Sequence, residues 1–440
     1  MVLDNLTPII EESMERWAVP GLTIGILEDG HISAAAYGVR DLETNEPATS
    51  DTMFGVGSIS KMFTATTAVK MADEGRLDLD QPIETLAPTA TIPAALRGAG
   101  VSLRHLLSHR SGLDGDGFAD FGDDDQALER YLASLDHVGT LFPAGASWSY
   151  ANIGTCIAGH ILSCVAGLPF ETLVQQEILA PLGLSRTGFG QAPMPDNVAT
   201  GYDHGPGEEP KPHPAGTTWR SANPAGGMVS TVDNLLRFAA FHMSDGKVGD
   251  QQVISQDALR SMQQPLARLT SVDRWGLGWA IRSVGDVEVI EHGGWMDGYR
   301  AKLTLLPHRN TAIAILNNGG FGHAANDEIL AALLERHFGA VDPDPTPQPL
   351  SESEAARFTG QYRSSHVDIT IRHEAGQLSA FYKTAWHEND GAEIGLGAIA
   401  PDELIIMDGE FKDDRIVFLP ELEDQDRRAI RFLSRVLYTV

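Results

Sequence analysis

The chain has 440 residues, of which 42% are hydrophobic and 21% charged, with 45 glycines and 24 prolines. This composition is typical of a globular enzyme, and the length predicts two or three folding units rather than one core. The formal net charge of -28 would repel phosphate backbones and anionic lipid headgroups, so we expect no nucleic-acid partner.

The start of the chain and its cysteines bear on the cellular compartment. Asp4, Glu11 and Glu12 stand where a secretory signal needs a basic stretch and then an apolar run. No apolar run reaches the length of a membrane-spanning helix. We therefore expect a cytoplasmic protein without a membrane span. Cys156 and Cys164, if they share one helix, lie about 12 Å apart along its axis, which is too far for a disulfide.

Strand and helix patterns alternate along the first 340 residues. Two β-rich runs flank Asp29-Gly30, a dipeptide that favours a tight hairpin. Apolar spacing then predicts a helix from Ser58 to Met71 that ends near Gly75, and another from residue 152 to about 167. Strand patterns resume at 275–284, 287–294, 300–307 and 311–318, with a turn at 308–310. Early and late strands must meet across the helical middle, which predicts an α+β fold with an inserted helical region.

The last hundred residues differ in character. Residues 341–354 are proline-rich and polar, which predicts a semi-rigid linker between a unit at 1–340 and one at 355–440. Strand-length apolar runs separated by turn residues predict that 355–440 form a small antiparallel β-barrel. Four arginines lie near its end, and we expect them to face solvent, although they could reach a substrate carboxylate: Arg427, Arg428, Arg431 and Arg435.

Ser58 and Lys61 form a Ser-x-x-Lys motif at the start of a predicted helix. Residues three apart lie on one helical face, so the Lys61 amine can reach the Ser58 hydroxyl. At the helix N-terminus, backbone N–H groups can also stabilise an oxyanion that develops on a substrate. The motif recurs at Ser244 and Lys247, but that copy lies on an Asp-Gly turn, which would not align its ends.

Two further short motifs lie where a cleft is expected. Tyr150-Ala151-Asn152 stands between a proline-glycine loop and a helix start. His292-Gly293-Gly294 ends a predicted strand, where glycines let a substrate backbone approach closely. His137 also matches His-x-Gly, but it has no flanking strand pattern and is interpreted as a surface residue.

Two candidate metal sites are weaker. His105 and His109 are four residues apart and could share zinc, but the glutamate of a metalloprotease helix is missing between them. The acidic run from Asp114 to Asp125 lacks the spacing of a calcium loop and is expected to be a solvated loop. We therefore expect neither metal nor cofactor.

The ordered motifs Ser-x-x-Lys, Tyr-x-Asn and His-x-Gly resemble those of the penicillin-recognising serine enzymes: class C β-lactamases, serine D-Ala-D-Ala carboxypeptidases, D-aminopeptidases and esterases. The blocks MFGVGSISKMFTA, VSLRHLLSHRSGL, FPAGASWSYANIG, APLGLSRTGF and AGGMVSTVDNLLRF also resemble family blocks, in family order. The resemblance implies a β-lactamase/transpeptidase-like antiparallel sheet flanked by helices, with an all-helical subdomain, followed by a lipocalin-like barrel. His292 stands where the β-lactamases carry the lysine of Lys-Thr-Gly, which favours the peptidase and esterase branches.

By this resemblance Ser58 is the nucleophile, and Lys61 and Tyr150 handle its proton. Both groups have ordinary pKa values near 10, so burial and their mutual influence must bring one of them towards neutrality. The sequence leaves open which of the two is the base. Asn152 is expected to hold Lys61 and the substrate amide by hydrogen bonds.

The resemblance also assigns the groups that would hold the substrate. The oxyanion hole is the backbone N–H of Ser58 and of Trp295. His292 would orient Tyr150 or the polar end of the substrate, and Gly293 and Gly294 would lie along it.

Several functions fit these residues. The first is hydrolysis of a peptide, amide or ester bond, with D-configured residues by resemblance. The second is a penicillin-binding-protein-type thioesterase that cyclises nonribosomal peptides delivered as carrier-bound or thioester substrates. The others are a non-catalytic receptor for peptidoglycan-like ligands and a zinc hydrolase built on His105 and His109. The oligomeric state is left open.

Overall fold

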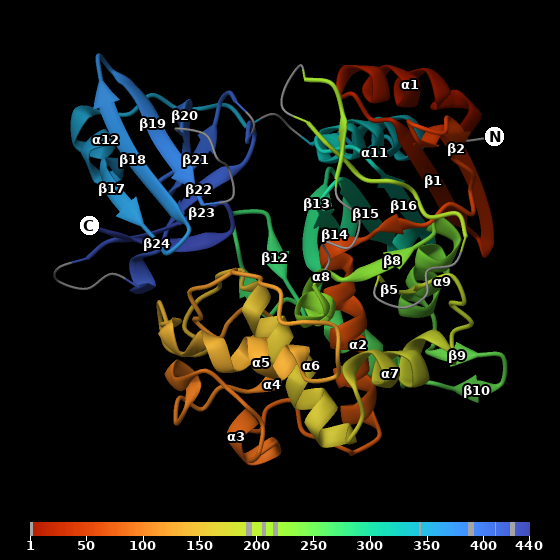
Figure 1. The fold of residues 1–440 in the computed structure, drawn as a ribbon. Coiled ribbons are helices and arrows are strands. Elements are labelled where there is room, and N and C mark those ends of the chain that lie inside the picture. Colours follow the sequence, from red (N-terminus) through yellow and green to blue (C-terminus); the bar gives the residue numbers. More distant parts are fainter. Residues whose placement is uncertain are drawn as a thin grey trace.

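The computed structural model describes residues 3–190, 196–204, 208–213, 219–342, 345–385, 391–409, 411–422 and 427–440. Its centre is a nine-stranded antiparallel sheet that runs in the order β11-β12-β13-β14-β15-β16-β1-β2-β3 (Figure 1). The strands are β1 (Gly21–Glu28), β2 (His31–Asp41), β3 (Glu46–Pro47), β11 (Ala267–Arg268), β12 (Arg274–Trp275), β13 (Ala280–Val284), β14 (Val287–Met296), β15 (Tyr299–Leu306) and β16 (Thr311–Asn317).

The predicted hairpin opens this sheet. Glu28 of β1 pairs with His31 of β2, so Asp29 and Gly30 form a two-residue turn. Their φ angles are +49° and +81°, as a type I′ turn requires. On its other side β1 pairs with β16, which confirms that early and late strands meet. The run predicted as one strand at 275–284 is divided between β12 and β13, where Gly278 has a φ of +82°.

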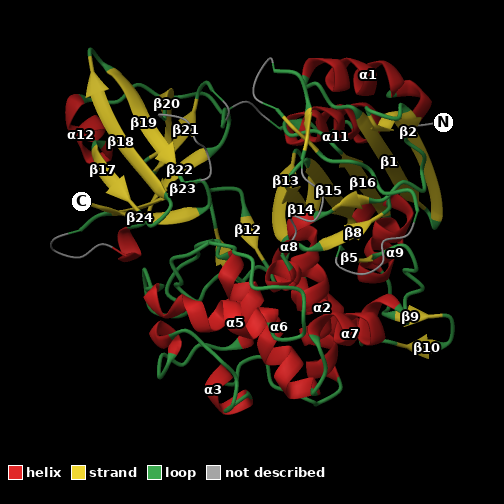
Figure 2. Ribbon diagram, viewed as in Figure 1, coloured by secondary structure: helices red, strands yellow, loops and turns green. Residues whose placement is uncertain are grey.

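Helices cover both faces of the sheet (Figure 2). Ile24 and Ile26 of β1 pack in one cluster with α1 (Thr7–Arg16) and α11 (Gly322–Phe338). The alternate residue Gly25 faces α9 (Val232–Met243), where an added Cβ would lie 2.7 Å from Leu236. The glycine therefore lets α9 approach the sheet closely.

The helical region lies between β3 and β11 in the chain. The predicted helices are confirmed as α2 (Ser60–Asp73) and α6 (Asn152–Ala166), and each is followed by a glycine with positive φ, Gly75 or Gly167. Cys156 and Cys164 both lie on α6 and are free, as expected. The other helices here are α3 (Ile83–Leu86), α4 (Leu103–Leu107), α5 (Ala127–Ala133), α7 (Phe170–Val174), α8 (Asn223–Gly226) and α10 (Gln256–Met262).

The hydropathy of these helices gives one further observation. Among the described residues no single helix has the length and apolar composition of a membrane span. Two helices joined by a sharp bend, Asn152–Ala166 and Phe170–Leu179, together have the length and apolar composition of a span, and only by those two criteria.

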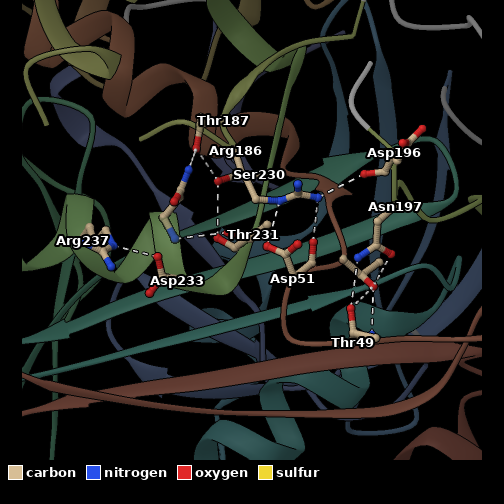
Figure 3. A network of polar contacts seen from close by, with 12 residues as sticks. Thr49, Asp51, Arg186, Thr187, Asp196, Asn197, Ser230, Thr231, Asp233 and Arg237 are labelled. Carbon is tan, nitrogen blue, oxygen red and sulfur yellow. Dashed lines mark hydrogen bonds and ion pairs between the residues drawn. The ribbon is translucent and has the colours of Figure 1, made fainter. Parts of the chain in front are cut away.

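A polar network fixes the chain that leads to Ser58 (Figure 3). Arg186 donates to the carbonyl oxygens of Asp51 and Asp196, and Thr187 bonds Ser230 through their hydroxyls at 2.8 Å. These residues flank a small sheet of β4 (Phe54–Gly55), β8 (Met228–Ser230) and β5 (Gly188–Phe189). The network thus anchors β4, from which the chain enters the turn that carries Ser58.

Two further strand pairs are β6 (Tyr202–Asp203) with β7 (Lys211–Pro212), and β9 (Lys247–Val248) with β10 (Gln251–Gln252).

The carboxy-terminal unit is a closed barrel of eight strands, as the sequence predicts. Its helix α12 (Glu352–Phe358) begins inside the stretch expected to be linker, and Phe358 packs on Phe418 with ring centroids 4.9 Å apart. The strands are β17 (Gly360–Arg363), β18 (Val367–Glu374), β19 (Gln377–Thr384), β20 (Ala392–Ala400), β21 (Glu403–Ile406), β22 (Arg415–Phe418), β23 (Ala429–Phe432) and β24 (Arg435–Thr439).

The β23–β24 hairpin docks the barrel on the helical region. Val436 N donates to Ser149 Oγ at 3.1 Å, and Tyr438 Oη donates to Leu141 O at 2.7 Å. Val436 also shares a buried apolar cluster with Phe142. Segments almost 300 residues apart therefore form one interface.

The expectation that the terminal arginines face solvent is wrong for Arg431 and Arg435. Arg431 is 5% exposed and donates from Nε to Trp148 O at 3.1 Å and from Nη1 to Leu269 O at 2.5 Å. The hairpin carries both side chains into the interface rather than away from it. Arg427, by contrast, is exposed, and Arg428 donates to carbonyl oxygens within the barrel unit.

We predict that Arg431→Ala destabilises the protein. It removes two charge-assisted hydrogen bonds and leaves the buried carbonyl oxygen of Trp148 unpaired, at a cost of about 3 kcal/mol. Arg357→Ala, at an exposed position of α12, should cost about 0.5 kcal/mol or less. Chemical denaturation of the whole chain measures both. Equal unfolding midpoints for the two variants would contradict a structural role for Arg431.

Candidate active site

Ser58 and Lys61 lie next to each other at the start of α2. Ser58 belongs to the 3₁₀ turn Gly57–Ile59, and Lys61 follows one turn later. Lys61 Nζ lies 2.9 Å from Ser58 Oγ and donates to Ala225 O of α8 at 2.6 Å. Ser58 is partly exposed, whereas Lys61 is 2% exposed. An accessible hydroxyl is thus paired with a buried amine.

Burial makes the Lys61 amine a much weaker base than usual. Desolvation lowers the pKa of Lys61 to about 7, opposed by the nearby Cys156 and Asp116 and assisted by Arg435. A buried ammonium loses its hydration, so the neutral form gains relative stability. A large fraction of Lys61 is therefore unprotonated at neutral pH and can accept the Ser58 proton.

Tyr150 lies over the same pair. Its ring centroid is 5.1 Å from Lys61 Nζ, and the ring stacks on His109 at 4.1 Å. Burial raises the pKa of Tyr150, while a hydrogen bond to Ser58 and the charge of Arg435 act to lower it. The phenol therefore stays protonated at neutral pH and can donate to Ser58 or to a substrate atom.

His109 supports the Tyr150 segment. Its backbone has a φ of +57°, its carbonyl accepts from Ser149 N at 3.0 Å, and its Nδ1 accepts from Ala151 N at 3.2 Å. Burial lowers the pKa of His109 well below its ordinary value, so the ring is neutral. From the sequence, His109 was considered only as a metal ligand, whereas in the structure its ring packs against Tyr150.

Asn152 is held by Asp116, not by Lys61 as expected. Both Asn152 N and Asn152 Nδ2 donate to Asp116 Oδ1 at 2.9 Å. Asp116 Oδ2 pairs with Arg435 from the barrel. The expectation of a solvated acidic loop is wrong for Asp116, which is 7% exposed because these partners enclose it.

His292 lines the site from β14. Its Nδ1 donates to Gly293 O at 2.6 Å, so Nε2 is the acceptor nitrogen. That Nε2 is buried and has no hydrogen-bond partner among the described residues. Burial lowers the pKa of His292 to about 3, so a neutral ring is available to accept from a substrate N–H or O–H. The His292 and Tyr150 rings are 6.3 Å apart.

The backbones of β14 and the Ser58 turn touch each other. A Cβ on Gly57, whose φ is +49°, would lie 2.6 Å from Trp295 N, and one on Gly294 would lie 2.0 Å from Val56 O. Only glycine permits this approach at both positions. It brings the two backbone segments expected to form the oxyanion hole into contact.

The remaining candidates lie apart from this constellation. Lys247 pairs with Asp245 on the turn after α9, and His137 is exposed. His105 completes a capping box with Ser102 at the start of α4. Among the described residues, no group of three or more histidine, cysteine, aspartate or glutamate side chains could hold a metal ion.

The sequence did not predict the observed roles of three residues of the site: His109, Asp116 and Arg435. The available signals were weak. Arg431 and Arg435 stand within apolar strand patterns, but charged residues are mostly exposed, so the pattern does not separate a buried arginine from an exposed one. Nothing in the spacing of Asp116 separates it from the other acidic residues around it.

The chain is similar to known proteins both in sequence and in structure. A family model described as Beta-lactamase matches residues 6–336. Penicillin-binding protein 4 of Amycolatopsis lactamdurans is 29% identical over 337 residues, covering 74% of this chain and 88% of its own. An unguisins hydrolase of Aspergillus campestris is 22% identical over 338 residues, which cover 71% of this chain and 61% of the hydrolase. The crystal structure of SurE matches with a TM-score of 0.79 and 26% identity over 99% of this chain and 98% of its own. The structure of SurE with D-Leu matches with a TM-score of 0.76 and 25% identity, over 99% of both chains.

The contact between β14 and the Ser58 turn yields a test. Gly294→Ala should reduce the rate of covalent labelling of Ser58 by a fluorophosphonate on the order of 100-fold, because its methyl group would displace one backbone from the other. Gly188→Ala, in β5, is the control: an added Cβ there has no neighbouring atom within 4 Å and the residue lies outside the site, so labelling should be unchanged. Intact-mass spectrometry follows both reactions, and equal rates would refute the close-contact interpretation.

Proposed function

The chain belongs to the β-lactamase family of serine hydrolases, and we propose that it hydrolyses peptide, amide or ester bonds through an acyl ester on Ser58. The observation that carries this proposal is the 2.9 Å contact between Ser58 Oγ and a buried Lys61 amine with a pKa of about 7. A serine hydroxyl needs such a partner to become an effective nucleophile.

Acylation can proceed with the groups present. Neutral Lys61 takes the Ser58 proton while Oγ attacks the substrate carbonyl carbon. The backbone N–H groups of Ser58 and Trp295 then stabilise the oxyanion. As the carbonyl re-forms, the bond to the leaving group breaks, and Tyr150 gives its proton to that group and takes one from Lys61.

Deacylation repeats this sequence with water. Water attacks the ester carbonyl and loses its proton to the Lys61–Tyr150 pair. Ser58 Oγ leaves and regains a proton, which restores the resting site. The neutral His292 Nε2 is suited to accept a hydrogen bond from an N–H or O–H of the acyl group. We assign the base role to Lys61 because burial lowers its pKa and raises that of Tyr150.

We further propose a substrate with a D-configured residue next to the scissile bond. SurE, which matches the whole length of this chain, has been crystallised with D-Leu. A relative by sequence is named as a hydrolase of unguisins. The complex with D-Leu supports the D-configured residue, and the unguisins hydrolase supports hydrolysis as the reaction.

The base assignment predicts the pH dependence of acylation. Labelling of wild type should rise about tenfold per pH unit below 7 and level off above about 8, because only unprotonated Lys61 accepts the Ser58 proton. Lys61→Ala should lower the plateau on the order of 100-fold or more. Ser58→Ala is the control and should not be labelled. Labelling of this variant equal to wild type would mean another nucleophile, whereas a wild type that is not labelled would indicate a binding protein without this chemistry.

The fate of the acyl ester separates hydrolysis from peptide cyclisation. Both begin with the same ester, but a cyclase must exclude water and present an amine. We expect D-amino-acid amides to yield free acids, with turnover unchanged by EDTA. A peptidyl thioester with a C-terminal D-residue should yield the linear acid, as measured by mass spectrometry. Untouched amides together with a thioester product one water lighter would identify a cyclase, and zinc-restored activity after EDTA would identify a metal enzyme.

A further inference from the structure

Asp116 and Arg435 come from different folding units and meet beside Tyr150. Asp116 lies in the loop before α5, and Arg435 begins β24 of the barrel. Their side chains are 2% and 15% exposed, and both Arg435 Nε and Nη2 contact Asp116 Oδ2. The pair is therefore largely removed from solvent, where one charge without the other would be costly.

Each member of the pair also holds a residue of the Tyr-x-Asn motif. Asp116 Oδ1 accepts two hydrogen bonds from Asn152, and the Arg435 guanidinium lies 4.8 Å from the Tyr150 ring centroid. A cation over an aromatic face attracts the ring electrostatically, more strongly when both are desolvated. The two motif residues are thus oriented through one ion pair.

The barrel backbone reinforces this contact. Ser434 O, at the tip of the β23–β24 hairpin, accepts from Tyr150 N at 2.9 Å. Leu433 and Ser434 form the tip with φ angles of +46° and +62°, which non-glycine residues adopt at some cost. The interface therefore holds the tip in a strained conformation at the point where it touches the catalytic segment.

We propose that Asp116 and Arg435 are positioning residues whose ion pair couples the β-barrel to Tyr150 and Asn152 and places two opposite charges beside the proton-transfer groups. This rests on the proposed acyl-serine chemistry. It assigns to the barrel a direct part in the site: the first 340 residues hold the nucleophile and the base, and the barrel fixes the segment that carries the phenol.

The charges around Lys61 and Tyr150 allow the proposed role of Asp116 and Arg435 to be distinguished from a purely structural one. Burial leaves the thiol of Cys156 and the rings of His109 and His292 neutral near pH 7, with the pKa of Cys156 raised to about 12 and that of His292 lowered to about 3. Among the described residues, the titratable and charged groups around Lys61 and Tyr150 are His109 after α4, Asp116 before α5, Cys156 in α6, His292 in β14 and Arg435 in β24.

The two charged groups act in opposite directions. Arg435 lowers the pKa of both Lys61 and Tyr150, and Asp116 raises both. Removing the positive charge should therefore move the pH midpoint of acylation upward. Removing the negative charge should move it downward. A loss of packing alone would not produce opposite shifts.

The experiment measures fluorophosphonate labelling of Ser58 against pH in the full-length chain. Arg435→Gln should raise the midpoint and Asp116→Asn should lower it, each by about half a pH unit or more, and both should slow the plateau rate about tenfold or more. The double variant should return the midpoint towards wild type while remaining slow. Arg435→Lys keeps the charge and should retain the wild-type midpoint.

A matched control is Arg415→Gln. Arg415 is another largely buried barrel arginine that pairs with an acid, Glu403, and also bonds Ser271 outside the barrel at 2.7 Å. It should leave the midpoint unchanged. Arg435→Met provides a second neutral variant if Arg435→Gln does not fold. Unchanged midpoints, or shifts in one direction, would overturn the proposal, whereas failure of wild type to label at Ser58 would instead overturn the acyl-serine chemistry.

Discussion

The side chain of Lys61 is buried between two neutral oxygen atoms, Ser58 Oγ and Ala225 O, and the site depends on that burial. An ammonium group in this position loses hydration without gaining a carboxylate in direct contact, and its pKa falls to about 7. The whole of α2 supports this environment, because its residues from Ser60 to Met71 are buried on every side. A helix so enclosed requires the sheet on one side and the helical region on the other.

The same enclosure explains why the molecule is built from distant segments. Lys61 is covered by α8, Tyr150 is covered by His109 and the barrel hairpin, and His292 reaches the site from β14. Each of these lies in a different part of the chain. A basic amine can be dehydrated only if several elements close over it together, and the polar groups carried in with them must then find partners inside. Asp116 and Arg435 satisfy each other in this way.

Local patterns predicted the fold and the centre of the site well. The hairpin at Asp29-Gly30, helices α2 and α6 and the closed barrel follow from turn residues and apolar periodicity. Ser58 and Lys61 follow from helical spacing. Arg431, Asp116 and Arg435 were misjudged because their burial depends on contacts across about 300 residues, and a charged residue looks the same in a sequence whether its partner is water or a distant carboxylate. Asn152 was expected to hold Lys61, but its observed partner, Asp116, depends on the same distant contact.

The histidine at position 292 completes this electrostatic arrangement. A lysine there would place a second ammonium near Lys61 and lower the pKa of Lys61 further. His292 is instead neutral, with a pKa of about 3, and it offers an acceptor nitrogen rather than a positive charge. The protonation of Lys61 is then controlled by burial and by the Asp116–Arg435 pair alone among the fixed charges that act on it. Because one member of that pair belongs to the barrel, the docking of the barrel and the basicity of Lys61 are physically linked.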